Sequence, residues 1–304
     1  MCSYLCQSII NLEMLIFAAD AALSTSIEAI KGSYVAFDKR IHDVRPQLGQ
    51  SISASRIRSF LDNSEINDSH VDCDRVQDSY SFRCAPQVHG PMIDVLREAR
   101  RIVNIEINSA TDNPLVFSSN GKPEVISGGN FHGQILAIIS DNMAICIHEI
   151  ASISERRINQ VLDPQWSGQK AFLANDEGLE SGLMIVQYVA AAVIAELSLL
   201  SNPVSTTNVP VSMGKEDHVS MGATASYRTF KASKLLSSVI SSELICSCQA
   251  LDNISEKPSK SVGKIHYWLR NYVSKIEADR STTKDTEIIA KLLLTPEFIE
   301  IFRE

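Results

Sequence analysis

Three short polar segments separate long apolar stretches of this 304-residue chain, and they hold the side chains best suited to chemistry. In the first segment, Gln77, Tyr80 and Arg83 recur at intervals of three residues, so a helix would place them on roughly one side. A guanidinium such as that of Arg83 can hold a carboxylate through two parallel hydrogen bonds. The Tyr80 phenol can donate a hydrogen bond or relay a proton. Spacing alone, however, favours a solvated helical turn.

The second segment covers residues 127–133, in which adjacent glycines precede Asn130, Phe131 and His132. Adjacent glycines permit positive φ angles and a close approach of the backbone to a ligand. The Gly-Lys-Ser/Thr sequence that completes a phosphate-binding loop does not follow them. Spacing alone therefore favours a turn that connects a hairpin to a helix.

The third segment covers residues 202–222 and contains Glu216, Asp217 and His218 in succession. These residue types can bind a metal, but adjacent side chains do not readily point the same way. No further histidine follows at a spacing typical of metal ligands. The segment is better interpreted as a loop and helix N-terminus, where the helix dipole favours acidic residues.

Composition limits the function classes open to the chain. Its formal net charge of -8 argues against nucleic acid or an anionic membrane as a partner. The seven cysteines are odd in number and irregularly spaced, which predicts reduced thiols in a cytoplasmic protein rather than a disulfide framework. The N-terminus has no basic region or cleavage site typical of a secretory signal. Residues 183–200 are very apolar but contain Gln187 and Glu196, so we expect a helix buried in a bundle rather than a membrane span.

Apolar residues at helical spacing predict a helix over 12–31, and a short helix is expected over 51–63. A further helix is expected to begin at Pro91 and to end by Pro114. Two short extended runs around Asn120-Gly121 predict a β-hairpin near 115–126. Three long helices are expected over 132–162, 178–201 and 220–253, with shorter ones over 265–277 and 283–303. Long helices with short polar connections favour a bundle.

Taken in this order and at these distances, the segments resemble one family, the aromatic amino acid ammonia-lyases. The most specific motifs are Gln77–Arg83, Thr111–Pro114 paired with Gly128–Gly133, and Glu216–Gly222. The Glu216 motif resembles the histidine branch, because the phenylalanine branch usually carries an amide at this position. Residues 37–50, Ser154–Arg157, Asp163-Pro164 and Glu180–Met184 also match the family pattern.

The resemblance implies an all-α fold, a long-helix bundle of the aspartase/fumarase-like type. Residues 1–304 would form a single C-terminal helical-bundle portion of an ammonia-lyase, with core helices over about 132–253 and smaller helices over 258–304. The implied reaction eliminates ammonia from L-histidine to give urocanate, as in histidine catabolism. The family forms homotetramers whose active sites combine loops from several subunits, so we expect a homo-oligomer acting on an amino-acid substrate.

The resemblance also assigns roles to particular side chains. Arg83 would hold the substrate carboxylate, a role that suits a planar guanidinium. Glu216 would face the imidazole ring and accept a ring N–H, so phenylalanine would leave it unpaired. The implied substrate-binding residues are Gln77, Arg83, Asn130 and Phe131, and the implied catalytic residues are Tyr80 and Glu216.

The family's electrophile is methylidene-imidazolone (MIO), which forms from an internal Ala-Ser-Gly sequence, and no metal is implied. Three Ser-Gly pairs occur here, at Ser127, Ser167 and Ser181, and none follows an alanine. We therefore expect that this chain cannot form the electrophile and is inactive or severely impaired alone. A separate N-terminal lyase chain would supply the electrophile and the base.

Other functions remain open on the sequence. The chain could be a non-catalytic lyase remnant or an assembly partner, which would keep the helix packing without the reaction. It could instead belong to a tyrosine or phenylalanine ammonia-lyase or an aminomutase. In any of these cases we expect residues 12–31 and 183–200 to expose apolar helix surface to a missing part.

Overall fold

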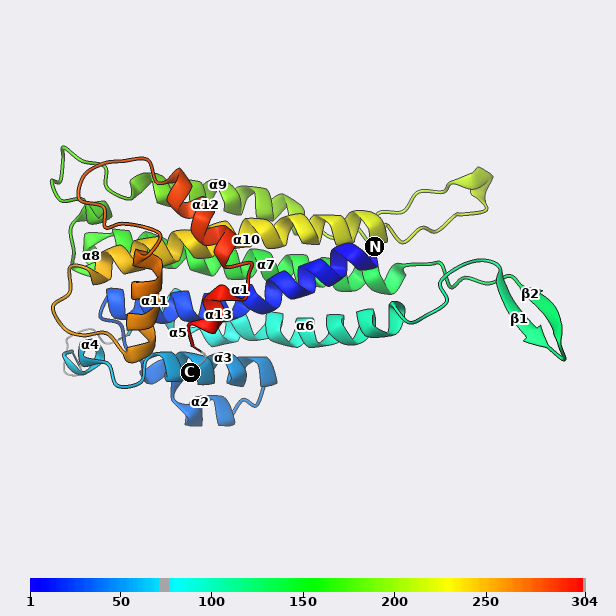
Figure 1. Cartoon of the computed structure of the whole chain (residues 1–304), viewed down its shortest axis with the longest axis horizontal. Coiled ribbons are helices and arrows are strands. Elements are labelled where there is room, and N and C mark those ends of the chain that lie inside the picture. Colours follow the sequence, from blue (N-terminus) through cyan, green and yellow to red (C-terminus); the bar gives the residue numbers. More distant parts are fainter. Residues whose placement is uncertain (71–76, 303–304) are drawn as a thin grey trace.

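The computed structural model describes residues 1–70 and 77–302, and these form an elongated helical bundle with one projecting hairpin (Figure 1). The long helices are α1 (Cys2–Ala29), α6 (Ala85–Glu106), α7 (Gln134–Leu162), α9 (Met184–Leu200) and α10 (Gly222–Leu251). The shorter helices are η1 (Val35–Phe37), α2 (Lys39–Asp43), α3 (Leu48–Phe60), α4 (Glu65–Asp68), α5 (Tyr80–Arg83), α8 (Pro164–Ser167), η2 (Ala171–Leu173), η3 (Ser212–Gly214), α11 (Lys260–Arg270), α12 (Thr283–Leu292) and α13 (Glu297–Glu300).

The hairpin is the single sheet among the described residues, as the sequence predicted. Strand β1 (Leu115–Ser119) pairs antiparallel with β2 (Lys122–Ile126), and Leu115 lies opposite Ile126. Asn120 and Gly121 form the turn, both with positive φ, which the Asn-Gly sequence favours. The all-α bundle with one small hairpin is therefore confirmed.

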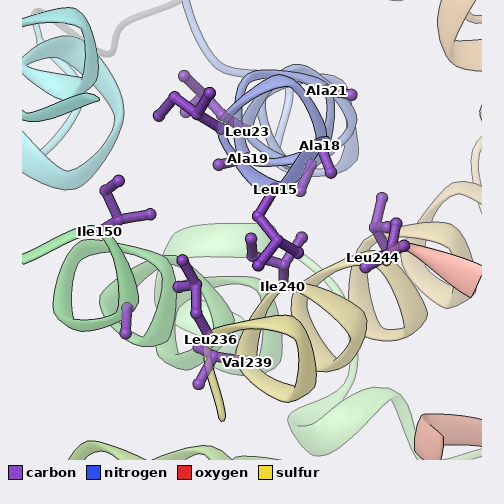
Figure 2. Packing of buried hydrophobic residues seen from close by; sticks show 14 of the residues in the cluster. Leu15, Ala18, Ala19, Ala21, Leu23, Ile150, Leu236, Val239, Ile240 and Leu244 are labelled. Carbon is purple, nitrogen blue, oxygen red and sulfur yellow. The ribbon is translucent and has the colours of Figure 1, made fainter. Parts of the chain in front are cut away.

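Helix α1 lies at the centre of the bundle, in contact with α6, α7 and α10. Its side chains are buried along nearly the whole helix, and the alanines at 18, 19, 21 and 22 allow neighbouring helices to approach closely. Figure 2 shows Leu15 extending from α1 toward Ile240 of α10. The expectation that residues 12–31 expose apolar surface to a missing part was wrong, because this chain's own helices cover them.

Helix α6 begins earlier than the sequence predicted. Pro86 lies in its first turn, and Pro91, which was expected to begin the helix, lies inside it. One backbone hydrogen bond is lost at Pro91, but the preceding turn buries His89 and Gly90 against α1 and α3. A Cβ on Gly49 would lie 2.1 Å from the Gly90 carbonyl oxygen, so these two helices cross at van der Waals contact.

Helix α9 differs from its prediction in extent and in burial. Residues 178–183 form a loop in which Gly178 and Gly182 have positive φ, so the helix begins only at Met184. Within α9 only Val186, Ala190 and Leu197 are buried, and Leu199 is 70% exposed. The expectation of a helix buried inside the bundle was therefore wrong for this chain, whereas the expected apolar exposure over 183–200 is confirmed.

Other boundaries differ by up to ten residues, because α1 begins at Cys2 rather than at residue 12 and α11 ends at Arg270 rather than at residue 277. Helices α7 and α10 match their predicted ranges to within two residues at each end. Helix α3 lies three residues earlier than expected and α11 begins five residues earlier, at Lys260 after the N-cap Ser259. The single helix expected over 283–303 is two helices, α12 and α13, because Pro296 interrupts it.

By length and composition alone, α1 and α7 could cross a membrane. In each helix, 56% of the most apolar stretch is buried in the bundle, so length and composition are weak evidence for a membrane span. The six described cysteines are free thiols, and burial raises the pKa of the Cys246 and Cys248 thiols. Cys73 lies outside the described residues.

Glu28 is a buried carboxyl near the end of α1, and its hydrogen bonds do not offset the cost of its burial. Its Oε1 accepts a hydrogen bond of 3.0 Å from the Ser259 backbone N–H, and its Oε2 has no partner. Burial, the largest cause, raises its pKa from 4.5 to about 7. The folded state therefore binds this proton more tightly than the unfolded state, and stability falls as pH rises from 4.5 to 7.

We predict that Glu28→Gln makes the protein more stable than wild type at pH 8, because the substituted side chain never ionises. A rise of this size in pKa corresponds to a loss of stability on the order of 3 kcal/mol in the wild type. Urea unfolding at pH 5 and pH 8 measures the difference, with the exposed Glu65→Gln as control. An unchanged pH dependence in Glu28→Gln would contradict the prediction.

Candidate active site

One group of predicted site residues lies on the four-residue helix α5 and on the three residues before it, 77–79. Tyr80 is 68% exposed, and the Arg83 guanidinium carbon lies 4.6 Å from the centre of the Tyr80 ring. Gln77 is exposed just before the helix. Ser81 and Phe82, between Tyr80 and Arg83, are buried. The helix thus buries its central residues and presents Tyr80 outward, with Arg83 half-buried beside it.

A cavity of about 410 Å³ opens beside this helix, within the size range of small-molecule sites. Gln77, Arg83 and Gln87 line it, together with the segment after α1. Arg83 Nε and Gln87 Oε1 have no hydrogen-bond partner among the described residues, and both atoms are closed off from solvent. The half-buried Arg83 side chain lines the cavity, which makes the cavity a candidate ligand site.

The second group follows the hairpin. Asn113 Oδ1 accepts hydrogen bonds of 3.0 Å from the Ser127 hydroxyl and 2.8 Å from the Gly128 N–H, which closes the base of the hairpin. Asn130 Nδ2 donates to the Ala110 carbonyl at 3.4 Å. Phe131 is 50% exposed. These residues therefore form the turn between hairpin and helix that spacing favoured.

Glu216 lies on the exposed loop between α9 and α10. It accepts a 2.8 Å hydrogen bond from the Ser212 hydroxyl through Oε1. His218 of this loop joins the Phe131 turn, because His132 Nε2 lies 3.0 Å from the His218 carbonyl oxygen and the two rings stack 5.8 Å apart. Contacts between the loops thus hold Glu216 and Phe131 at the same end of the bundle. No cluster of three or more His, Cys, Asp or Glu residues in the described ranges is placed to hold a metal.

The two groups lie at opposite ends of the bundle. Helix α7 begins at Gln134, just after Phe131, and its far part contacts the Tyr80 helix through Arg157 and Gln160. At 1.5 Å per residue, Gln134 and Arg157 are about 35 Å apart. Figure 1 shows the hairpin and the α9–α10 loop projecting from one end, far from α5. One chain therefore brings together Gln77, Tyr80 and Arg83, and separately Asn130, Phe131 and Glu216, but does not join the groups.

Sequence reasoning missed two residues at this site. Gln87 lines the cavity, and Arg157 contacts the backbone of α5. Arg157 lies in a motif that matched the family, but nothing in its spacing links it to residue 81. Gln87 lies four residues after Arg83, and helical spacing across the break at Cys84 is the signal that could have identified it.

A family model described as aromatic amino acid lyase matches residues 1–271. The histidine ammonia-lyase of Myxococcus xanthus is 41% identical over 96% of this chain and 57% of that protein. The histidine ammonia-lyase of Bos taurus is 40% identical over 97% of this chain and 46% of that protein.

The solved structures that resemble this chain have the same helical fold. The crystal structure of histidine ammonia-lyase from Trypanosoma cruzi has a TM-score of 0.90 at 34% identity, over 99% of this chain and 56% of that one. Tyrosine aminomutase from Streptomyces globisporus also has a TM-score of 0.90, at 30% identity, over 99% of this chain and 61% of that one. The chain spans about half the length of the curated relatives it matches. Because the fold agrees and the family model matches all but the last 33 of its 304 residues, the chain belongs to the aromatic amino acid lyase family.

Proposed function

We propose that this chain supplies the substrate-carboxylate-binding part of a histidine ammonia-lyase, which eliminates ammonia from L-histidine to give urocanate. The observation that carries the proposal is the cavity beside α5, which is lined by the half-buried Arg83 side chain. A half-buried guanidinium that lines a cavity is suited to a carboxylate. The histidine ammonia-lyases that are about 40% identical to this chain support histidine as the substrate.

In this proposal Arg83 binds the carboxylate, while Tyr80 and Gln77 orient the substrate and its reaction partner. Phe131 packs beside the reacting group, with Asn130 in the same turn. Glu216 accepts a hydrogen bond from the imidazole ring and so selects histidine over phenylalanine. Its carboxylate is exposed and takes one donor from within the described chain, the Ser212 hydroxyl, so it has capacity for another.

The family's electrophile, methylidene-imidazolone, does not fit the residues of this sequence. None of the three serines that precede a glycine, Ser127, Ser167 and Ser181, follows an alanine. Ser127 also donates its hydroxyl hydrogen bond to Asn113 at the base of the hairpin. We therefore assign the electrophile and the base to a segment outside these 304 residues, either in the same protein or in another chain.

The two groups of site residues belong, in this proposal, to one pocket built from different copies. The separation of about 35 Å along α7 excludes a pocket within one copy, unless the rigid helix breaks. Exposed apolar side chains on the hairpin and on α9 support assembly, because they suit a surface covered by a second copy. These include Val116, Phe117, Val125, Ile185 and Leu199.

The first test combines the chain with a separately produced N-terminal segment that contains Ala-Ser-Gly. We expect urocanate from L-histidine in the mixture and none from the 304-residue chain alone.

Arg83→Met should lower kcat/KM by more than about a hundredfold, because a charge-assisted pair to the substrate carboxylate is lost. Tyrosine and phenylalanine serve as competing substrates. The absence of any product with all three amino acids would favour a non-catalytic assembly role.

A second prediction uses the separation of the two groups. Arg83→Met copies and Glu216→Ala copies, each inactive with the N-terminal segment, should regain activity when they are mixed and reassembled. Random exchange restores roughly a quarter of the sites, because Arg83 and Glu216 of one site come from different copies. Activity that stays at the level of either single variant would contradict a shared site. Mixing two batches of the same variant is the control.

A third prediction concerns association. We expect the chain to form oligomers in sedimentation, since a two-stranded hairpin with apolar side chains on both faces is marginal in water. Val116→Ser together with Val125→Ser removes one apolar cross-strand pair and should weaken association. Ser118→Thr on the same strand is the matched control. A compact monomer of the unaltered chain at micromolar concentration would contradict the prediction.

A further inference from the structure

The four-residue helix α5 carries Tyr80 and Arg83 and cannot hold its own position. Three backbone hydrogen bonds close it, from Phe82 and Arg83 to Ser79 and from Cys84 to Tyr80. Helix formation is unfavourable for so short a segment without support from the rest of the fold. The direction in which Tyr80 and Arg83 point must therefore be set by contacts outside α5.

Helix α7 supplies polar contacts at two points of this segment. Arg157 Nη1 donates a hydrogen bond of 3.1 Å to the carbonyl oxygen of Ser81, in the middle of α5. The Ser79 hydroxyl, just before α5, donates 2.8 Å to Gln160 Oε1. Arg157 and Gln160 lie three residues apart and thus face α5 together.

Arg157 is itself held by a buried ion pair with Glu243 of α10. Its Nε donates to Glu243 Oε1 at 2.5 Å and its Nη2 donates to Glu243 Oε2 at 2.8 Å, and both side chains are fully buried. The same carboxylate accepts hydrogen bonds from Ser26 of α1 and Ser154 of α7. With both carboxylate oxygens engaged, the guanidinium plane is fixed and its remaining nitrogen, Nη1, is aimed at Ser81.

We infer that Arg157 and Glu243 are positioning residues for the carboxylate-binding helix α5. The pair fixes the Ser81 carbonyl relative to the bundle and, through it, the direction of Tyr80 and Arg83. A lysine could not replace Arg157, because an ammonium cannot reach both carboxylate oxygens and Ser81 in the geometry of a planar fork. The inference rests on the proposed function for the role of Arg83, but the placement of α5 can be tested without it.

The test must separate positioning from general stability. Removing Arg157 alone would leave a buried charge on Glu243 and unfold much of the protein. The double variant Arg157→Met with Glu243→Leu removes both charges and keeps apolar volume, so we expect it to fold. Leu244→Ala is the matched control, because this fully buried neighbour of Glu243 destabilises α10 without contacting α5 through a hydrogen bond.

Hydrogen exchange of the full 304-residue chain is the first measurement. In the double variant we expect amides of residues 82–84 to exchange more than about tenfold faster, while protection in α7 and α10 is retained. In Leu244→Ala these amides should change no more than the rest of the bundle. Equal protection of residues 82–84 in the double variant and the wild type would overturn the inference. Should the double variant fail to fold, Arg157→Lys, which keeps the charge, is measured in its place with the same expectation.

Kinetics with the N-terminal segment present is the second measurement. Per folded site, the double variant should lose about ten- to a hundredfold in kcat/KM, since small displacements of binding groups have effects of this size. Leu244→Ala should keep its kcat/KM at a temperature where it is folded. An unchanged kcat/KM in a folded double variant would overturn the inference. No activity with the wild-type chain would contradict the proposed function and leave the exchange experiment to decide the inference.

Discussion

The carboxylate of Glu243 sets the arrangement of the three central helices. A fully buried carboxylate costs several kcal/mol in lost hydration unless donors surround it, so α10 can pack only where they do. The guanidinium of Arg157 and the hydroxyl of Ser154 reach it from α7, and the hydroxyl of Ser26 reaches it from α1. Satisfying this one group therefore fixes the register of α1, α7 and α10 together.

Asp20 of α1 is a second buried carboxylate, and it fixes α1 relative to α3 and α6. Its Oδ1 accepts a hydrogen bond of 2.6 Å from the Ser53 hydroxyl of α3 and lies 2.9 Å from His89 Nδ1 of α6. All three side chains are fully buried. Apolar packing alone tolerates small slips between helices, whereas a buried acid leaves few alternatives. The central helix α1 is thus tied to its neighbours at two separate points along its length.

Rigid helices in a fixed register determine where the chemistry can occur. Helix α7 joins the Phe131 turn to the neighbourhood of Tyr80 with 29 residues of unbroken helix. Such a helix keeps its two ends apart regardless of side-chain motion, so the proposed pocket requires the two groups to come from different copies. The length of α7 therefore sets the distance between the two groups of site residues.

Much of this architecture could be predicted from the sequence, because apolar periodicity and the Asn120-Gly121 turn are local signals. The wrong helix boundaries have two physical causes. Burial of residues 85–90 keeps Pro91 inside a helix, and glycines with positive φ delay the start of α9. The motif residues were found by resemblance, but their division between two ends depends on helix length and direction, which no motif contains. Sequence reasoning assigned Arg157 no role, because its partner is the backbone carbonyl of Ser81, which every residue type carries.

The exposed elements connect assembly to the site. The hairpin carries apolar side chains on both faces, and the turn with Asn130 and Phe131 follows it directly. Two strands alone are marginal in water, so the order of this arm depends on a surface that covers it. If that surface belongs to a second copy, the contact that stabilises the hairpin also places Phe131 and Glu216 of one copy beside Arg83 of the other. The pocket would then form only in the assembly, because the helix that separates the two groups within one copy is too rigid to bring them together.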